Sequence, residues 1–263
     1  MQNLFRIIIL FVFLGFSQQV FGWGMTGHRV IAEIAENHLN RKAKRNIERL
    51  IGKQKLAYWS NWADFIKSSS DTALLKTSSW HFVNAPGHLS FEAYQEVLRS
   101  SPEHNLYKAY QRVREQASDR RLDDAKRREA LYFMIHLLAD AHQPMHVGRE
   151  EDLGGNRISV SFFNRKTNIH RVWDSDLVDN EKYGYTEYAR VLDYNPAFYA
   201  QYTNSSLEEW FYESHQLANL IYQDVAKEKK LAYDYVFRFK EPMEQCLLKA
   251  GLRLAKELNA VFG

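Results

Sequence analysis

Leu-Tyr-Phe-Met-Ile-His-Leu-Leu-Ala-Asp-Ala-His-Gln-Pro-Met-His, residues 131–146, is the stretch around which the rest of the chain must fold. His136 and Asp140 are four residues apart, so on an α-helix they lie one turn apart on the same face. Their neighbours are mostly apolar, which predicts a buried helix. Burial of an imidazole and a carboxylate is costly unless something compensates. A simple His–Asp hydrogen bond would compensate, and so would a metal ion.

Pro144 ends this helix, because proline lacks an N–H group and disfavours helical backbone in the residue before it. His146 follows directly after the break, so its side chain can point in a different direction from those of the helix. Taken alone, the segment leaves both interpretations open: an ordinary core helix that ends in a turn, and a metal-binding helix.

Residues 1–22 have the pattern of a secretory signal peptide. Arg6 precedes an apolar run at residues 7–15, which is short for a membrane span, and Val20-Phe21-Gly22 suits signal peptidase. Cleavage there would leave Trp23 as the new N-terminus; the alternative is an uncleaved membrane anchor. We predict an exported protein, periplasmic or secreted, whose mature chain is residues 23–263.

The composition fits one mature domain. Lys and Arg number 35 and Asp and Glu 32, and this net charge of +3 is too small to indicate a polyanionic partner by itself. The only cysteine, Cys246, excludes an intrachain disulfide, which is unusual for an exported protein. No linker or repeat divides residues 23–263, for which we expect a monomer with no stable protein partner.

The spacing of apolar residues predicts a mostly all-α fold, a single helical domain. We expect a first helix, capped by Thr26, that runs through Val30 and Ala35. Alternation of Ile158, Val160 and Phe162 with polar residues predicts one small β-hairpin at residues 158–170, with its turn at residues 164–168. The other expected helices span residues 42–51, 59–68, 91–98, 106–116, 124–141, 207–222 and 241–262.

Several further residues could carry chemistry. His170 and Asp174 repeat the four-residue spacing, but in a strand they would lie about 13 Å apart, so they can share a metal only if the chain turns helical by His170. Each candidate alone has an ordinary explanation, such as a surface ion pair or a core histidine. The candidate nitrogen and oxygen ligands are the Trp23 terminus, His28, Asp64, His81, His136, Asp140, His146, His170 and Asp174.

The order of these motifs resembles the S1/P1 nuclease family of zinc-dependent phosphodiesterases. The resemblance implies a mostly helical domain, similar to phospholipase C and P1 nuclease, with three Zn²⁺ ions at the base of a cleft. The motifs that carry it are Trp23-Gly24, Gly27-His28, Trp62-Ala63-Asp64, Trp80-His81-Phe82, His136 to His146, Gly154-Gly155-Asn156, and His170 to Asp174.

By this resemblance, the ligands divide among three zinc ions. Asp64, His81, His136 and Asp140 would hold the first. The α-amine and carbonyl oxygen of Trp23 would hold the second together with His28 and Asp140, which therefore bridges two ions. His146, His170 and Asp174 would hold the third. Imidazoles and carboxylates suit zinc better than magnesium, and these sets leave room for water.

The resemblance also implies substrate contacts and catalytic roles. Phe82 would stack on a base, Asn84 would hydrogen-bond the edge of that base, and Asn156 would contact a phosphate. Asp64, beside the bridging Asp140, would orient the attacking water, and Lys67 would stabilise charge on the phosphate. The expected activity is endonucleolytic cleavage of single-stranded DNA or RNA to 5′-phosphorylated products, with 3′-nucleotides as a further candidate substrate.

Two other functions stay open at this point. The related bacterial zinc phospholipase C also begins with a ligating Trp, but its first histidine lies farther along and its last ligand is Glu rather than Asp174. A non-catalytic zinc-binding module would not need Lys67, Phe82 and Asn84. The histidines that match no ligand position are expected at the surface or behind the ligands: His38, His88, His104, His142 (facing away from Asp140) and His215.

Overall fold

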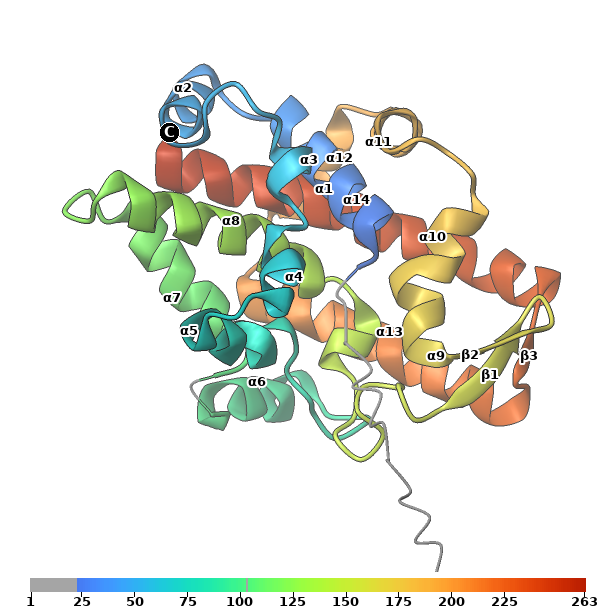
Figure 1. Cartoon of the computed structure of the whole chain (residues 1–263). Helices are drawn as coiled ribbons and strands as arrows, with labels where there is room; N and C mark the ends of the chain where they lie inside the picture. Colours follow the sequence, from blue (N-terminus) through green and yellow to red (C-terminus); the bar gives the residue numbers. More distant parts are fainter. Residues whose placement is uncertain (1–22, 103) are drawn as a thin grey trace, which may run out of the picture.

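The computed structural model describes residues 23–102 and 104–263, so the predicted signal peptide at residues 1–22 lies outside the described residues. The described part is mostly helical, as the sequence predicts (Figure 1). In that part, no helix is long and apolar enough to span a membrane. Two helices, α8 (Asp124–Asp140) and α14 (Tyr233–Phe262), run through the interior, and α1 (Met25–Asn37) packs along α14.

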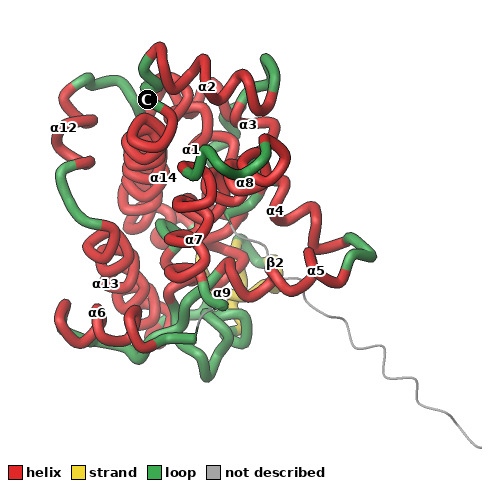
Figure 2. The backbone as a smooth tube through the Cα atoms, turned by 90° about the vertical axis from the view of Figure 1, so that its left-hand side faces the viewer, coloured by secondary structure: helices red, strands yellow, loops and turns green. Residues whose placement is uncertain are grey.

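Helix α8 is the central element of the core. Every residue from Ala130 to Asp140 is buried, as the apolar run predicts. Its start is fixed by Asp123, whose side chain accepts a hydrogen bond from the backbone N–H of Lys126. Helices α7 (Leu106–Ser118), α1 and α14 surround α8, as Figure 2 shows from the side. The His136–Asp140 face is therefore presented to the interior and not to solvent.

The predicted cap of the first helix is wrong. Helix α1 begins at Met25 with Gly24 as its N-cap, so Thr26 lies inside the first turn. The hydroxyl of Thr26 instead donates to Asp179 Oδ1 at 2.8 Å, a tertiary contact that outweighs its capping preference. Capping chemistry does define α2 (Arg41–Ile51), where the Asn40 side chain accepts from two backbone N–H groups.

The helix expected at residues 59–68 is broken into short pieces. The chain forms α3 (Leu56–Trp59), α4 (Trp62–Phe65) and the 3₁₀ turn η1 (Ile66–Ser68), followed by α5 (Thr72–Leu75) and η2 (Lys76–His81). The break at Ser60 frees its carbonyl oxygen, which accepts a hydrogen bond from His136 Nδ1 at 2.7 Å. A continuous helix would have used this carbonyl internally.

The predicted hairpin is present, but its turn lies earlier than expected. Strand β1 (Ser159–Phe162) pairs antiparallel with β2 (Arg165–Asn168). The turn is Phe163-Asn164, both with positive φ, as in the tight turns that match strand twist. A third strand, β3 (Lys230–Leu231), pairs parallel with β1 and was not predicted, because its partner is far away in sequence.

Helix α9 (Ile169–Arg171) begins directly after β2, so the chain is helical by His170, which is the condition for His170 and Asp174 to lie together. A π-helical turn, η4 (Val172–Asp176), follows and carries Asp174. The remaining elements are η3 (Pro144–Val147), α6 (Phe91–Ser100), α10 (Leu177–Asn180), α11 (Tyr185–Leu192), α12 (Ala197–Thr203) and α13 (Leu207–Lys227).

Candidate metal centre

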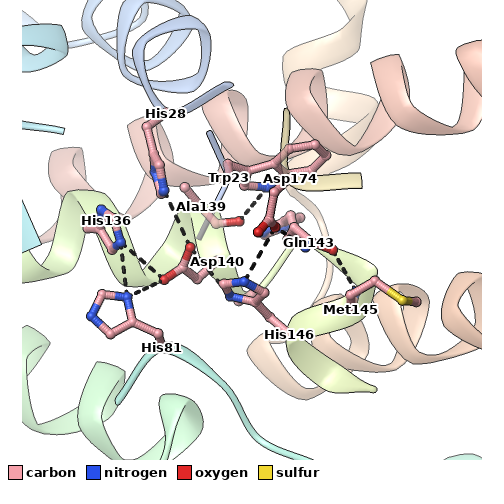
Figure 3. A network of polar contacts seen from close by, with 12 residues as sticks. Trp23, His28, His81, His136, Ala139, Asp140, Gln143, Met145, His146 and Asp174 are labelled. Carbon is pink, nitrogen blue, oxygen red and sulfur yellow. Dashed lines mark hydrogen bonds and ion pairs between the residues drawn. The ribbon is translucent and has the colours of Figure 1, made fainter. Parts of the chain in front are cut away.

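Asp140, at the C-terminal end of α8, is the central residue of the site (Figure 3). Its Oδ2 lies 2.9 Å from His81 Nδ1 and 3.2 Å from His136 Nε2. Its Oδ1 lies 3.5 Å from His28 Nε2 and 3.5 Å from His146 Nδ1. All five side chains are buried. The two carboxylate oxygens therefore face two different sets of imidazoles.

Backbone carbonyls set the orientation of two of the rings. His136 Nδ1 donates to the carbonyl of Ser60, so its Nε2 presents a lone pair towards Asp140. His170 Nδ1 donates to the carbonyl of Gly154 at 2.6 Å, and its Nε2 faces Asp174 Oδ2 at 3.2 Å. An N–H group held in this way, with the other nitrogen exposed to the site, is typical of histidines that bind metals.

A second carboxylate approaches the same imidazoles from α4. Asp64 Oδ1 lies 3.6 Å from His136 Nε2 and 3.8 Å from His81 Nδ1. The same oxygen accepts a hydrogen bond from Lys67 Nζ at 2.7 Å, as the three-residue spacing suggests. The side chains of Asp64 and Lys67 are 11% and 8% exposed, whereas those of Asp140, His81 and His136 are 0% exposed, so the cluster opens towards solvent on this side.

A third group lies on the other side of Asp140. Asp174 Oδ1 is 3.6 Å from His146 Nε2, and Asp174 Oδ2 faces His170. Gln143 Nε2 donates to Asp174 Oδ1, while Gln143 Oε1 accepts from the backbone N–H of Met145 at 2.5 Å. Gln143 was not among the predicted site residues, although its position just before Pro144 was a signal that its amide lies at the helix break.

Trp23 is fully buried next to the segments that carry Asp140 and Asp174. Its indole Nε1 donates to the carbonyl of Ala139 at 2.9 Å, and the backbone N–H of Gly24 donates to the carbonyl of Asp174 at 2.5 Å. The indole packs against Gly27, where a Cβ atom would lie 3.1 Å from the Trp23 side chain. These contacts tie Trp23 and Gly24 to the backbone of the two segments that carry Asp140 and Asp174.

The structure brings the predicted side-chain ligands together, and the candidate ligand atoms in each group lie within 4.8 Å of one another. His136 borders two of the groups, whereas the sequence analysis assigned it to one. Among the described residues, the groups are His28, His136 and Asp140; Asp64, His81 and His136; and His146, His170 and Asp174.

The charges of the site suit a cation. Burial opposes ionisation of Asp140, but the surrounding His136 and His146 outweigh it and hold its pKa well below the usual range. Burial, with a contribution from His136, keeps the pKa of His28 well below its usual value. Burial and the nearby Lys67 ammonium lower the pKa of His81 to about 4. The site thus combines an anionic carboxylate at Asp140 with the imidazoles of His28 and His81, whose low pKa keeps them in the neutral form that binds metals. Burial opposes the charged form of His136, but the carboxylates of Asp140 and Asp64 outweigh it and raise the pKa of His136, so a metal would have to displace a proton there.

Buried ligand atoms that have no hydrogen-bond partner show whether a metal ion fits this site. Both ring nitrogens of His28, and Oδ1 of Asp140, are buried without a hydrogen-bond partner in the part of the chain that the structure describes. Leaving a buried polar atom unpaired costs about 1–3 kcal/mol. A divalent cation between His28 Nε2 and Asp140 Oδ1, which lie 3.5 Å apart, would satisfy these two atoms together, and the nitrogen and oxygen donors match zinc.

The three residues predicted to contact the substrate, Phe82, Asn84 and Asn156, differ in how they are placed relative to the ligands. Val83 N–H donates to the carbonyl of His146 at 2.8 Å, which places the half-buried Phe82 and Asn84 next to the metal centre. Asn156 is also half-buried, but its amide nitrogen donates to the carbonyl of Leu153 at 2.9 Å, within its own turn. Phe82 and Asn84 therefore lie close to the ligand groups in the chain, whereas the side chain of Asn156 is hydrogen-bonded within its own loop.

Two of the remaining histidines are buried and are not surface residues. His142 faces away from Asp140, as predicted, and its Nε2 lies 3.1 Å from Arg253 Nη1. His215 stacks on Tyr94 with 4.5 Å between the ring centres. His38 pairs with Asp193 at 2.7 Å.

Comparison with known proteins agrees with this geometry. A family model described as S1/P1 Nuclease matches residues 23–263. The chain is 28% identical over 268 residues to Endonuclease 3 of Arabidopsis thaliana, which covers 91% of this chain and 89% of the relative. It is 25% identical over 178 residues to Nuclease S1 of Aspergillus oryzae, with 66% and 60% covered. Nuclease P1 of Penicillium citrinum is 28% identical over 160 residues, with 58% and 57% covered.

Proposed function

Because the chain belongs to the S1/P1 nuclease family and is therefore a nuclease, we propose that it is an exported, zinc-dependent endonuclease of single-stranded DNA and RNA. Its products would be 5′-phosphorylated, and 3′-nucleotides would be a further substrate. The observation that carries the proposal is the cluster of three ligand groups around one buried carboxylate, Asp140. An ordinary core helix with one His–Asp hydrogen bond would not need so many imidazoles and carboxylates around the same residue.

The ligand groups favour three zinc ions. We assign one ion to Asp64, His81, His136 and Asp140, one to the Trp23 terminus with His28 and Asp140, and one to His146, His170 and Asp174. Zinc, when bound there, would supply Lewis acidity to the phosphoryl group and promote the ionisation of water near pH 7. The α-amine of Trp23 can contribute only after cleavage of the peptide bond that precedes it.

The protein's own residues would then orient the substrate. Asp64 can accept a hydrogen bond from the attacking water at the more exposed side of the cluster. Lys67, held by Asp64 at 2.7 Å, can donate to non-bridging oxygens as charge develops on the phosphate. Phe82 can stack on a base of any identity, and Asn84 can bind the edge of that base. Bases already stacked in a duplex cannot reach Phe82, so we expect single strands to be preferred.

The test uses the chain that begins at Trp23, purified and loaded with zinc. We expect about three zinc ions per chain by elemental analysis. Single-stranded DNA and RNA should be cleaved faster than duplex, with 5′-phosphate ends in the products, and chelation should abolish activity until zinc is restored. The variant Lys67→Ala should turn over more slowly with its metal content unchanged. One metal per chain would contradict the three-zinc assignment, and hydrolysis of phosphatidylcholine in place of DNA would contradict the substrate.

A further inference from the structure

A hollow of about 420 Å³ lies next to the metal centre, outside the ligand groups. One wall is the loop of residues 84–88, and the other is residues 149–151. The backbone N–H of Ala85 donates to the carbonyl of Gly148 at 2.9 Å, and the Val83–His146 bond joins the same two segments at the ligands. These loops meet below α13 in the view of Figure 1. The two segments that carry the ligands His81 and His146 therefore also form the two walls of the hollow, a few residues farther along the chain.

Arg149 lines this hollow and stacks on an aromatic ring. Its guanidinium carbon lies 4.3 Å from the centre of the Tyr222 ring. The Tyr222 hydroxyl accepts from the backbone N–H of Arg149 at 3.1 Å and donates to Asp152 Oδ1 at 2.8 Å, so the ring is itself fixed. On the opposite side, a Cβ atom on Gly87 would lie 2.8 Å from Arg149 Nη2. The guanidinium thus lies between an aromatic ring and Gly87, where a methyl group would push it aside.

The guanidinium charge of Arg149 forms no ion pair among the described residues. Arg114, Arg165 and Arg253 each form an ion pair with a carboxylate. Within residues 23–102 and 104–263, Arg149 forms no such pair, and its buried Nε has no hydrogen-bond partner. Glu150 and Glu151 also line the hollow, but both are exposed. A planar guanidinium that stacks on an aromatic ring and forms no ion pair within the described residues is suited to bidentate recognition of a phosphate group.

We propose that Arg149 binds a phosphodiester of the substrate strand, one nucleotide away from the base held by Phe82 and Asn84, and that the hollow holds this neighbouring nucleotide. The inference rests on the proposed nuclease function. The volume lies within the range of about 300–1,000 Å³ usual for ligand pockets. The carboxylates of Glu150 and Glu151 at the rim favour an internal phosphodiester, with one negative charge, over a terminal phosphate with two.

The experiment compares Arg149→Ala and Arg149→Lys with Arg238→Ala, a matched control in which the arginine of α14 pairs with Asp224 of α13. We expect Arg149→Ala to lower kcat/KM for a single-stranded decamer about tenfold, mainly through KM, with little effect on a dinucleotide that lacks the second phosphate. The plot of log(kcat/KM) against log[salt] has a negative slope, and loss of one phosphate contact should make that slope less steep by about 0.7. Arg149→Lys should recover part of the loss, and Arg238→Ala should match the wild type.

Gly87→Ala supplies a second route to the same result, because its methyl group would displace the guanidinium while Arg149 stays in the sequence. Equal kcat/KM for Arg149→Ala and wild type on the decamer would overturn the inference, and so would an equal loss on dinucleotide and decamer, which a structural role would produce. A binding measurement separates the proposed nuclease function from the proposed contact of Arg149 with a phosphodiester. Binding of the decamer to wild type and to Arg149→Ala would be measured by fluorescence anisotropy in the presence of a chelator. If the wild type does not cleave but Arg149→Ala still weakens binding, the nuclease proposal fails and the contact stands.

Discussion

His136 and His142 lie six residues apart at the end of α8 and belong to two buried polar clusters. In the cluster of His142, Nδ1 donates to the carbonyl of Leu138 at 2.8 Å, and Nε2 accepts from Arg253. Arg253 also donates to Glu213 at 2.8 Å and to the carbonyl of Tyr202 at 2.9 Å. This cluster satisfies its own hydrogen bonds.

The cluster of His136 does not. There, lone pairs of imidazoles and carboxylates converge, and His28 and Asp140 keep buried atoms without a partner among residues that the structure describes. Both clusters are made of histidine and charged residues, so composition does not separate them. The difference is that one contains enough donors for its acceptors and the other needs a cation. The following changes test that distinction, in order of their expected effect on hydrolysis.

The largest effect is expected for Asp140→Asn. The amide removes the shared negative charge and points an N–H group at a ring nitrogen, so both adjoining ligand groups lose their metal. Hydrolysis of single-stranded DNA should fall by more than about a thousandfold. Elemental analysis should show less zinc. Near-normal activity with a full zinc content would make α8 an ordinary core helix.

A large but smaller loss is expected when one residue precedes Trp23. A peptide nitrogen has no lone pair to offer a metal, so the chain beginning Met-Trp23 should lack one zinc and lose about a hundredfold in rate. It should still fold around the other two ions. Both termini would be confirmed by mass spectrometry. If the two chains have equal zinc content and equal rates, Trp23 is no ligand.

Gln143→Leu should have an intermediate effect, because it removes the donor that orients Asp174 while roughly preserving volume. Loss of such a supporting hydrogen bond typically costs about 10–100-fold in metal affinity or activity. Competition with a fluorescent chelator would measure the affinity of the weakest zinc. An unchanged affinity would mean that His146 and His170 hold Asp174 without help.

The smallest effect on hydrolysis is expected for Arg253→Met, in the cluster of His142, whose polar groups hydrogen-bond to one another. The rate should stay within about threefold of the wild type, because no proposed ligand contacts Arg253. The free energy of unfolding should fall by about 2–3 kcal/mol, since hydrogen bonds to a charged group are lost and the buried His142 keeps an unpaired acceptor. Urea denaturation at saturating zinc would measure it. A loss of zinc would show that the two clusters are coupled.

Sequence reasoning predicted the parts of the fold that depend on local pattern. The buried face of α8 and the hairpin within residues 158–170 follow from spacing and from the apolar run. A helical turn by His170 was only the condition for His170 and Asp174 to share an ion, and the structure meets it. The joint positions of the predicted ligand side chains also agree with the structure. The zinc count and the role of the Trp23 amine stay predictions.

What the sequence did not predict depends on contacts between distant residues. The Thr26 hydroxyl binds Asp179, 153 residues away, and β3 forms only because β1 lies beside it. The helix break after Trp59 leaves the Ser60 carbonyl free to accept a hydrogen bond from His136. The guanidinium of Arg149 is positioned by contacts with Tyr222 and Gly87. None of these partners is near in sequence, so neither periodicity nor capping preference could indicate them.

The indole of Trp23 and the carbonyl of Ala139 are 116 residues apart, and this contact has a consequence for how the protein folds. A centre built from such distant segments has a high contact order, so its ligands meet only when most of the chain is already in place. We therefore expect no isolated helix of this protein to bind zinc tightly. Zinc would bind the completed fold and stabilise it by mass action. It would slow unfolding and leave the rate of folding almost unchanged.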